Sequence, residues 1–270
     1  MQKHRLTGLL ALALSGACPA AELRQPTIDA FDGYIRTQEQ RIDAQVHGPE
    51  NGFLWSAASP ERLRQLQAGG IAVESRTGKD ALEVPGGLIH DWIGAVFVPG
   101  ARLEQVLALV QDYNRHKEIY KPEVIGSRML SHQGQDYRVY LRLLKKKVIT
   151  VVLDTEHDVR YFPLSGVRCY SRSYSTRIAE VRDAGKPGES ALPPGQGHGF
   201  LWRLDSYWRF LQKDGGVYVE CEAISLTRDV PAGLGWLISP IVRNLPRESL
   251  ESTLRNTRAA LTLSPSRTGP

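Results

Sequence analysis

A chain of 270 residues in which 41% are hydrophobic and 23% charged suits one or two globular domains with a sizeable core. The net charge of +5 falls to +3 without Lys3 and Arg5, an excess too small to indicate nucleic-acid binding. There is no CxxC motif and no cluster of cysteine and histidine, so we expect no metal and no cofactor. Cys169 and Cys221 fall within strand-like segments, and we expect both to be free buried thiols.

Residues 1–20 have the layout of a secretory signal peptide. The basic start Lys3-His4-Arg5 precedes the apolar run Leu6 to Leu14, which is too short to span a bilayer, and small residues follow. We therefore expect an exported protein, periplasmic or secreted, whose mature chain begins at residue 21 or 22. Lipoprotein anchoring through Cys18 is the alternative, but Ser15 stands where a lipobox requires an aliphatic residue.

Residues 22–86 are predicted to form an N-terminal helical extension packed on the main domain. Thr27 can cap a first helix, and Ser59-Pro60-Glu61 begins a second that ends at Gly69-Gly70. Two short extended pieces follow, Ile71 to Ser75 and Ala81 to Val84. The apolar stripe of the first helix consists of Ile28, Phe31, Ile35, Ile42 and Val46.

Residues 87–262 are predicted to form the main domain, and residues 263–270 a disordered tail. Long extended segments lie between an early helix and a late one, which predicts an α+β fold. The late helix is expected from Pro246 to about Leu261, after a segment that Pro240 interrupts. The early helix is expected over residues 101–122, with Leu103, Val106, Leu107 and Val110 on one face. The extended segments are Leu88 to Val98, Glu123 to Ser131, Asp136 to Leu144, Val148 to Val159 and Val167 to Arg182.

A strict alternation between His198 and Val230 predicts a long β-hairpin around the turn Lys213-Asp214-Gly215-Gly216. Trp202, Leu204, Trp208 and Phe210 fall on one face of its first strand. Small residues such as Cys221 and Ala223 follow on its second strand. Large rings beside small side chains either fill a core or line a cavity that another molecule fills.

The order strand, helix, antiparallel strands and long C-terminal helix resembles the START-like superfamily, which includes lipid-transfer and polyketide cyclase/dehydrase types. The residues that carry the resemblance follow the first helix: Asp112, Tyr113, His116, Tyr120 and Pro122. The resemblance covers about residues 87–262. It implies a helix-grip fold, in which a curved antiparallel β-sheet wraps around the C-terminal helix and encloses a ligand cavity. It leaves the ligand open, because such folds host many functions.

With that fold, we expect a mostly apolar pocket with a few polar side chains that can hydrogen-bond a ligand. In the segment Val167 to Arg182, alternation places Ser171, Ser173 and Ser175 on one face, where they would line the interior. The alternative is that these serines face solvent while Arg168, Tyr170, Arg172 and Tyr174, on the other face, pack under the N-terminal extension. The predicted ligand-binding residues are Tyr137, Val139, Leu141, Ser171, Ser173, Ser175, Trp202, Leu204, Trp208 and Phe210.

We therefore expect an exported protein that binds or carries a hydrophobic small molecule or lipid, as a monomer. The alternative is a cyclase or hydrolase-type enzyme acting on an apolar substrate in the same cavity, and a ligand-free scaffold is a third reading. No GxSxG elbow or other catalytic set is readable, and His157, between Glu156 and Asp158, is expected at the surface. Lys145-Lys146-Lys147 is expected to be a solvated turn or a transient contact with an anionic membrane surface.

Overall fold

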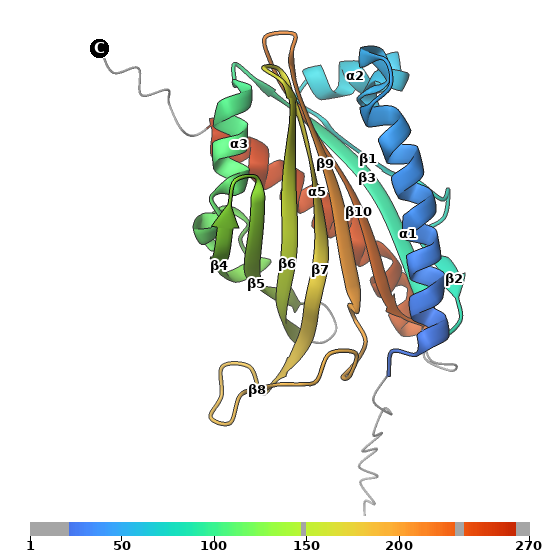
Figure 1. Cartoon of the computed structure of the whole chain (residues 1–270). Helices are drawn as coiled ribbons and strands as arrows, with labels where there is room; N and C mark the ends of the chain where they lie inside the picture. The colour runs from blue at the N-terminus through green and yellow to red at the C-terminus, as the bar shows by residue number, and fades with distance from the viewer. Residues whose placement is uncertain (1–21, 147–149, 230–234, 263–270) are drawn as a thin grey trace, which may run out of the picture.

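One curved antiparallel β-sheet forms the centre of the molecule (Figure 1). This computed structural model describes residues 22–146, 150–229 and 235–262, so the expected signal peptide, Cys18, Lys147 and the expected tail lie outside it. The strands follow one another across the sheet in the order β1 (Ile71–Ser75), β3 (Gly87–Pro99), β10 (Gly216–Arg228), β9 (Arg203–Lys213), β7 (Arg168–Arg182), β6 (Thr150–Ser165), β5 (Asp136–Lys146) and β4 (Val124–Gln133). Two short strands complete it: β2 (Leu82–Val84) pairs with β3, and β8 (Ser190–Ala191) pairs with β7.

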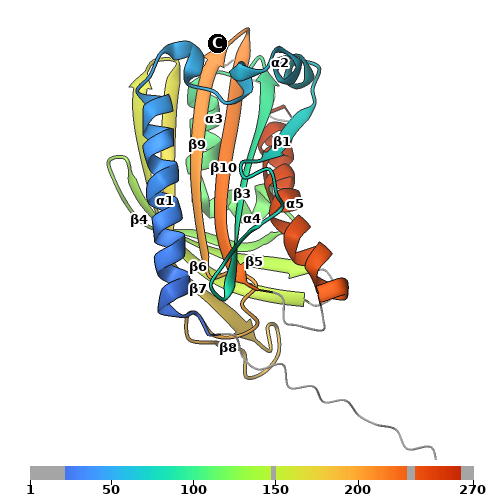
Figure 2. The same ribbon diagram turned by 90° about the vertical axis from the view of Figure 1, so that its right-hand side faces the viewer.

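Helices cover both faces of the sheet, as Figure 2 shows. The long helix α5 (Gly235–Thr262) crosses the inner face together with α3 (Leu103–Gln111), η3 (Tyr113–Arg115) and α4 (His116–Ile119). On the outer face lies α1 (Gln25–Val46), with η1 (Glu50–Gly52), η2 (Ser56–Ala58) and α2 (Pro60–Gln67) after it. The predicted α+β fold, a curved sheet with a long C-terminal helix and an N-terminal helix, is confirmed.

The hairpin of β9 and β10 has the predicted turn. Lys213 and Gly216 are paired, and the two residues between them, Asp214 and Gly215, have φ of 54° and 75°. Positive φ at both central residues is the geometry of a two-residue hairpin turn that matches the twist of its strands. The strand begins at Arg203, so the alternation that was expected from His198 onward does not hold for Trp202, which precedes the strand.

Close packing fixes α5 against the inner face. A Cβ atom added at Gly94 of β3 would lie 2.7 Å from Cδ1 of Leu254, so the absence of a side chain at this position lets α5 approach the sheet. Leu250 and Leu254 are both buried there. The predicted interruption at Pro240 is wrong, since α5 is continuous from Gly235. A proline removes one backbone hydrogen bond from a helix, and packing of the later turns on the sheet offsets that loss.

The N-terminal segment differs from its prediction in two respects. Thr27 lies inside α1, which begins at Gln25, and its hydroxyl donates instead to the carbonyl of Pro85 at 2.6 Å. The short strands β1 and β2 pair with β3 and are therefore part of the main sheet. The second helix is confirmed, because the Ser59 hydroxyl accepts from the Arg62 amide at its start.

The early helix is also shorter than predicted. It ends at Gln111, and the chain turns at Asp112 into η3 and α4. The turn brings Tyr113 and His116 into the interior, where both are buried. Burial of these rings explains why a straight helix does not continue.

A buried ionic network lies between α1 and the outer face of the central strands. Arg209 on β9 is 1% exposed, with its Nε 3.4 Å from Glu220 and its Nη2 3.6 Å from Glu222, both 0% exposed on β10. The backbone amides of Trp55 and Ser56 donate to Glu220 at 2.9 and 2.7 Å. Glu222 also pairs with Arg41 of α1. Removal of one partner would leave a buried charge unpaired, so each such loss lowers the free energy of unfolding by about 3–5 kcal/mol.

Burial also raises the pKa of two carboxyl groups beneath α1. Burial and then the charge of Glu222 raise the pKa of Asp91, which accepts a hydrogen bond from the Tyr34 hydroxyl at 2.8 Å. Burial raises the pKa of Asp205 to about 7, although its carboxylate accepts from the Ser175 amide at 3.3 Å. A pKa that is higher in the folded state than in the unfolded state means that protonation of the carboxyl stabilises the fold. For Asp205, this contribution to the free energy of unfolding is complete below the unfolded-state pKa and is lost as pH rises through about 7.

Substitution Asp205→Asn should flatten the dependence of stability on pH. The amide cannot ionise, and its oxygen can still accept from Ser175. Relative to wild type, the variant should gain stability as pH rises from 4 to about 7, by up to about 1.4 kcal/mol per pH unit. Urea unfolding at several pH values measures this. The exposed Asp158→Asn is the matched control, and wild-type and Asp205→Asn curves that run parallel would contradict the assignment.

Candidate functional site

A cavity of about 270 Å³ lies between the inner face of the sheet and α5. Strands β5, β6, β7, β9 and β10 supply one wall, and α5 with the segment between α3 and β4 supplies the other. Most of the lining is apolar: Val110, Val124, Val139, Leu141, Leu143, Leu153, Val159, Phe200, Leu201, Leu204, Trp208, Ala223, Leu245 and Leu250.

Small side chains at the centre of the sheet leave this space open. Trp208 stands between Ser171 on β7 and Cys221 on β10, which are its partners in register. One step along the strands, Ser173 pairs with Ser206. All four of these small residues line the cavity. Native cores are filled to high density, so a row of short side chains beside a large ring indicates a site for another molecule.

One end of the cavity is aromatic and closed. The hydroxyls of Tyr113 and Tyr161 lie 2.9 Å apart, and that of Tyr120 lies 3.2 Å from the Thr257 hydroxyl. His116 donates from Nε2 to the carbonyl of Val110 at 3.0 Å, and burial lowers the pKa of its imidazole to about 4. Burial raises the pKa of Tyr120 to about 12. These groups are therefore neutral and hydrogen-bonded at neutral pH.

The opposite end is polar and partly exposed. The Lys145 ammonium pairs with Glu123 and donates to the Ser249 hydroxyl at 2.7 Å. The two charged side chains are 18% and 26% exposed. Lys145 was expected in a solvated turn. It lies instead at the end of β5, where its pairing with Glu123 joins the sheet to the segment before β4.

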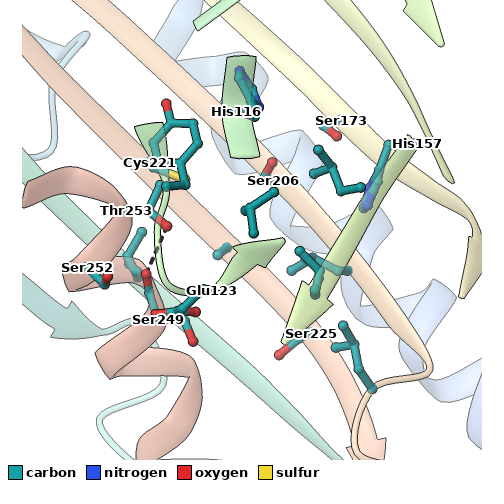
Figure 3. A pocket seen from close by; sticks show the side chains of 18 of the residues that line it. His116, Glu123, His157, Ser173, Ser206, Cys221, Ser225, Ser249, Ser252 and Thr253 are labelled. Atoms are coloured by element: carbon teal, nitrogen blue, oxygen red, sulfur yellow. Dashed lines mark hydrogen bonds between the residues drawn. The ribbon is translucent and has the colours of Figure 1, made fainter. Parts of the chain in front are cut away.

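His157 also differs from its prediction. The sequence predicts a position at the surface or at a loop edge, but His157 is 4% exposed and lines the cavity (Figure 3). Its neighbours Glu156 and Asp158 are more exposed and alternate to the other face of β6. Burial lowers the pKa of its imidazole to about 4. The sequence pattern separated His157 from its acidic neighbours correctly. It carried no sign of which face was inside.

Six of the ten predicted ligand-binding residues line the cavity: Val139, Leu141, Ser171, Ser173, Leu204 and Trp208. Tyr137 and Phe210 share that face of the sheet but pack in the adjoining core, where Phe210 is 0% exposed and stacks on Trp208.

Ser175 and Trp202 lie elsewhere, for identifiable reasons. A bulge interrupts the pairing of β7 with β6 beside Ser175, and its hydroxyl accepts from the Leu204 amide at 2.9 Å. Trp202 precedes the regular part of β9, and its ring packs in the outer-face cluster with α1.

The outer positions Tyr170, Arg172 and Tyr174 of β7 also face α1: Arg172 pairs with Asp43, and Tyr174 donates to Glu39. Each of the two interpretations of β7 is therefore correct in part, because Ser171 and Ser173 face the cavity while Tyr170, Arg172 and Tyr174 lie under α1.

Several lining residues were missed by the sequence reasoning. Tyr113, His116 and Tyr120 carried the family resemblance but were not assigned to the site. Ser225 and Thr227 continue the small-residue face of β10, which the alternation already indicated. The lining residues from α5, including Ser249, Ser252 and Thr253, had no local signal.

Comparison with known proteins gives likeness only in structure. No family model and no curated protein matches the sequence. A STAR-related lipid transfer protein fragment from Xanthomonas axonopodis is 17% identical with a TM-score of 0.46, over 72% of this chain and 99% of that chain. The Zhui aromatase/cyclase of a Streptomyces species is 12% identical with a TM-score of 0.45, over 67% and 99%. A START superfamily protein from Mycobacterium smegmatis is 13% identical with a TM-score of 0.41, over 64% and 97%.

The order of the strands and the long α5 across their inner face form the helix-grip arrangement that the resemblance read from the sequence implies. At these identities the likeness to the solved structures concerns the fold alone. Among the described residues, no group of three or more His, Cys, Asp or Glu could hold a metal ion. None of the described helices is long and apolar enough to cross a bilayer.

Proposed function

We propose that this protein binds or carries a hydrophobic small molecule or lipid inside the cavity between the sheet and α5. The observation that carries the proposal is the cavity itself, about 270 Å³ of space with a mostly apolar lining. Without a ligand, the apolar side chains that line this space remain in contact with water, and a ligand of modest size that covers them gains the corresponding hydrophobic free energy.

The energetics of such binding are favourable without an ionic contact. Burial of ten methylene groups contributes roughly 8 kcal/mol at about 0.8 kcal/mol each. Association costs several kcal/mol in lost translational and rotational freedom. The balance is compatible with affinities near the micromolar range.

The chemical state of the lining favours binding over catalysis. Burial raises the pKa of the Cys221 thiol and lowers that of His116 and His157 to about 4, so a thiolate and a charged imidazole are both disfavoured. Among the described cavity residues, no serine or cysteine is hydrogen-bonded to a histidine. The cyclase or hydrolase-type alternative therefore has no particular group to support it.

Substitution Ser173→Trp tests the cavity as the binding site. The ring would occupy the space where a ligand should lie, so binding of the uncharged dye N-phenylnaphthylamine should weaken by about tenfold or more. Stability should change little, because the ring enters existing space. Fluorescence titration and urea unfolding measure the two effects.

Ser131→Trp, on the exposed part of β4, is the matched control and should bind the dye as wild type does. A Ser173→Trp protein that binds the dye normally would refute the site. A loss of about 1–3 kcal/mol in stability with no space for a ligand would indicate an overpacked core instead.

We further propose that the protein acts outside the cytoplasm, on the strength of the basic and apolar start of the chain. Protein isolated from the cell envelope or medium of its host should begin at residue 21 or 22. N-terminal sequencing is the measurement, and an intact Met1 on that material would contradict export. A diacylglycerol-sized mass on Cys18 would establish a lipoprotein instead.

A further inference from the structure

Within the apolar cavity, one group of polar side chains lies together on the sheet wall. It comprises His157 on β6, Ser173 on β7, Ser206 on β9 and Ser225 on β10, and is called the polar patch below (Figure 3). Ser173 and Ser206 are direct partners in register. His157 is diagonal to Ser173, and Ser225 is diagonal to Ser206. Each pair of neighbours in this group is therefore close enough for one small group to contact both members, and Ser173 is the neighbour of both His157 and Ser206.

The hydrogen bonds of His157 determine which of its nitrogens is free to bind. The Thr155 hydroxyl donates to the carbonyl of Leu141 at 3.0 Å, so it has no proton left for the imidazole. Its oxygen therefore accepts from Nε2 of His157 at 3.1 Å. In the neutral ring this leaves Nδ1 as a bare acceptor. No described group hydrogen-bonds to Nδ1.

The serine hydroxyls of the polar patch are likewise available. Among the described residues, none donates to or accepts from the side-chain oxygens of Ser173, Ser206 and Ser225. His157 and Ser225 are 4% and 5% exposed, while Ser173 and Ser206 are half-buried. These polar groups face the cavity without a partner among the described residues, so a ligand there can supply one.

The charge of the cavity limits what that ligand can carry. Among the described residues, the charged side chains that line it are Lys145 and Glu123, which already pair with each other at the far, partly exposed end. A carboxylate or phosphate at the polar patch would therefore be buried without a cation, which is strongly unfavourable. A neutral oxygen has no such penalty.

Resting on the binding function proposed above, we propose that the polar patch recognises an uncharged hydroxyl or carbonyl group on an otherwise apolar ligand. A hydroxyl donates to Nδ1 of His157 and accepts from a serine hydroxyl. A carbonyl oxygen accepts from the hydroxyls of Ser173 and Ser206. The patch thereby selects oxygen-bearing apolar molecules over plain hydrocarbons and over anionic lipids.

Three probes of nearly equal size test this selectivity: naphthalene, a naphthol, and the naphthoate with its carboxylate at the same ring position. Fluorescence titration at neutral pH should show that the naphthol binds wild type about tenfold more tightly than naphthalene does. The naphthoate should bind more weakly than the naphthol. In the double variant Ser173→Ala/Ser206→Ala, naphthol binding should fall about tenfold while naphthalene binding persists.

Ser131→Ala is the matched control, because Ser131 is exposed on β4 and lies outside the cavity lining. It should keep the preference for the naphthol. Retained naphthalene binding shows that each variant is folded with an open cavity. Equal binding of naphthalene and naphthol to wild type, or tightest binding of the naphthoate, would overturn the polar patch and leave the binding function standing. Binding of none of the three probes would overturn both.

Discussion

The central strands β9 and β10 are buried on both faces, and the rest of the structure follows from this constraint. Alternation places Arg209 opposite Glu220 on the outer face and Trp208 opposite Cys221 on the inner face. The outer ions cannot be left without partners, so α1 covers them and supplies Arg41, while the turn after it supplies two backbone amides. The N-terminal helix is therefore required by the charges of the sheet that it covers.

The inner face of the same strands meets a different requirement. At β3 the glycine at position 94 lets α5 approach closely, and the helix is fixed there by Leu254. Further across the sheet, the short side chains of β7, β9 and β10 leave space that α5 spans without filling. The aromatic cluster at one end and the ion pair of Lys145 with Glu123 at the other bound this space. The outer face of the sheet is thus closely packed and ion-paired, while the inner face leaves a cavity that can hold a ligand.

Much of this could be predicted where the physics is local. Alternation and the Asp-Gly turn predicted the hairpin, and alternation along β7 separated its serine face from its Arg/Tyr face without showing which of the two is inside. The failures lie where regularity stops: the bulge redirects Ser175, and the irregular lead into β9 places Trp202 outside. His157 and the residues of α5 could not be assigned, because their positions depend on contacts between segments far apart in the chain.

We propose above all that the cavity holds an apolar molecule that the protein binds without a charged contact. Native mass spectrometry of the full chain, purified from its own host under gentle conditions, tests this directly. We expect one bound molecule per chain, released on denaturation, uncharged and bearing at least one hydroxyl or carbonyl oxygen. Protein that is saturated with an anionic lipid would contradict the chemistry assigned to the cavity. Protein that carries no ligand and binds no apolar probe would contradict the binding function itself.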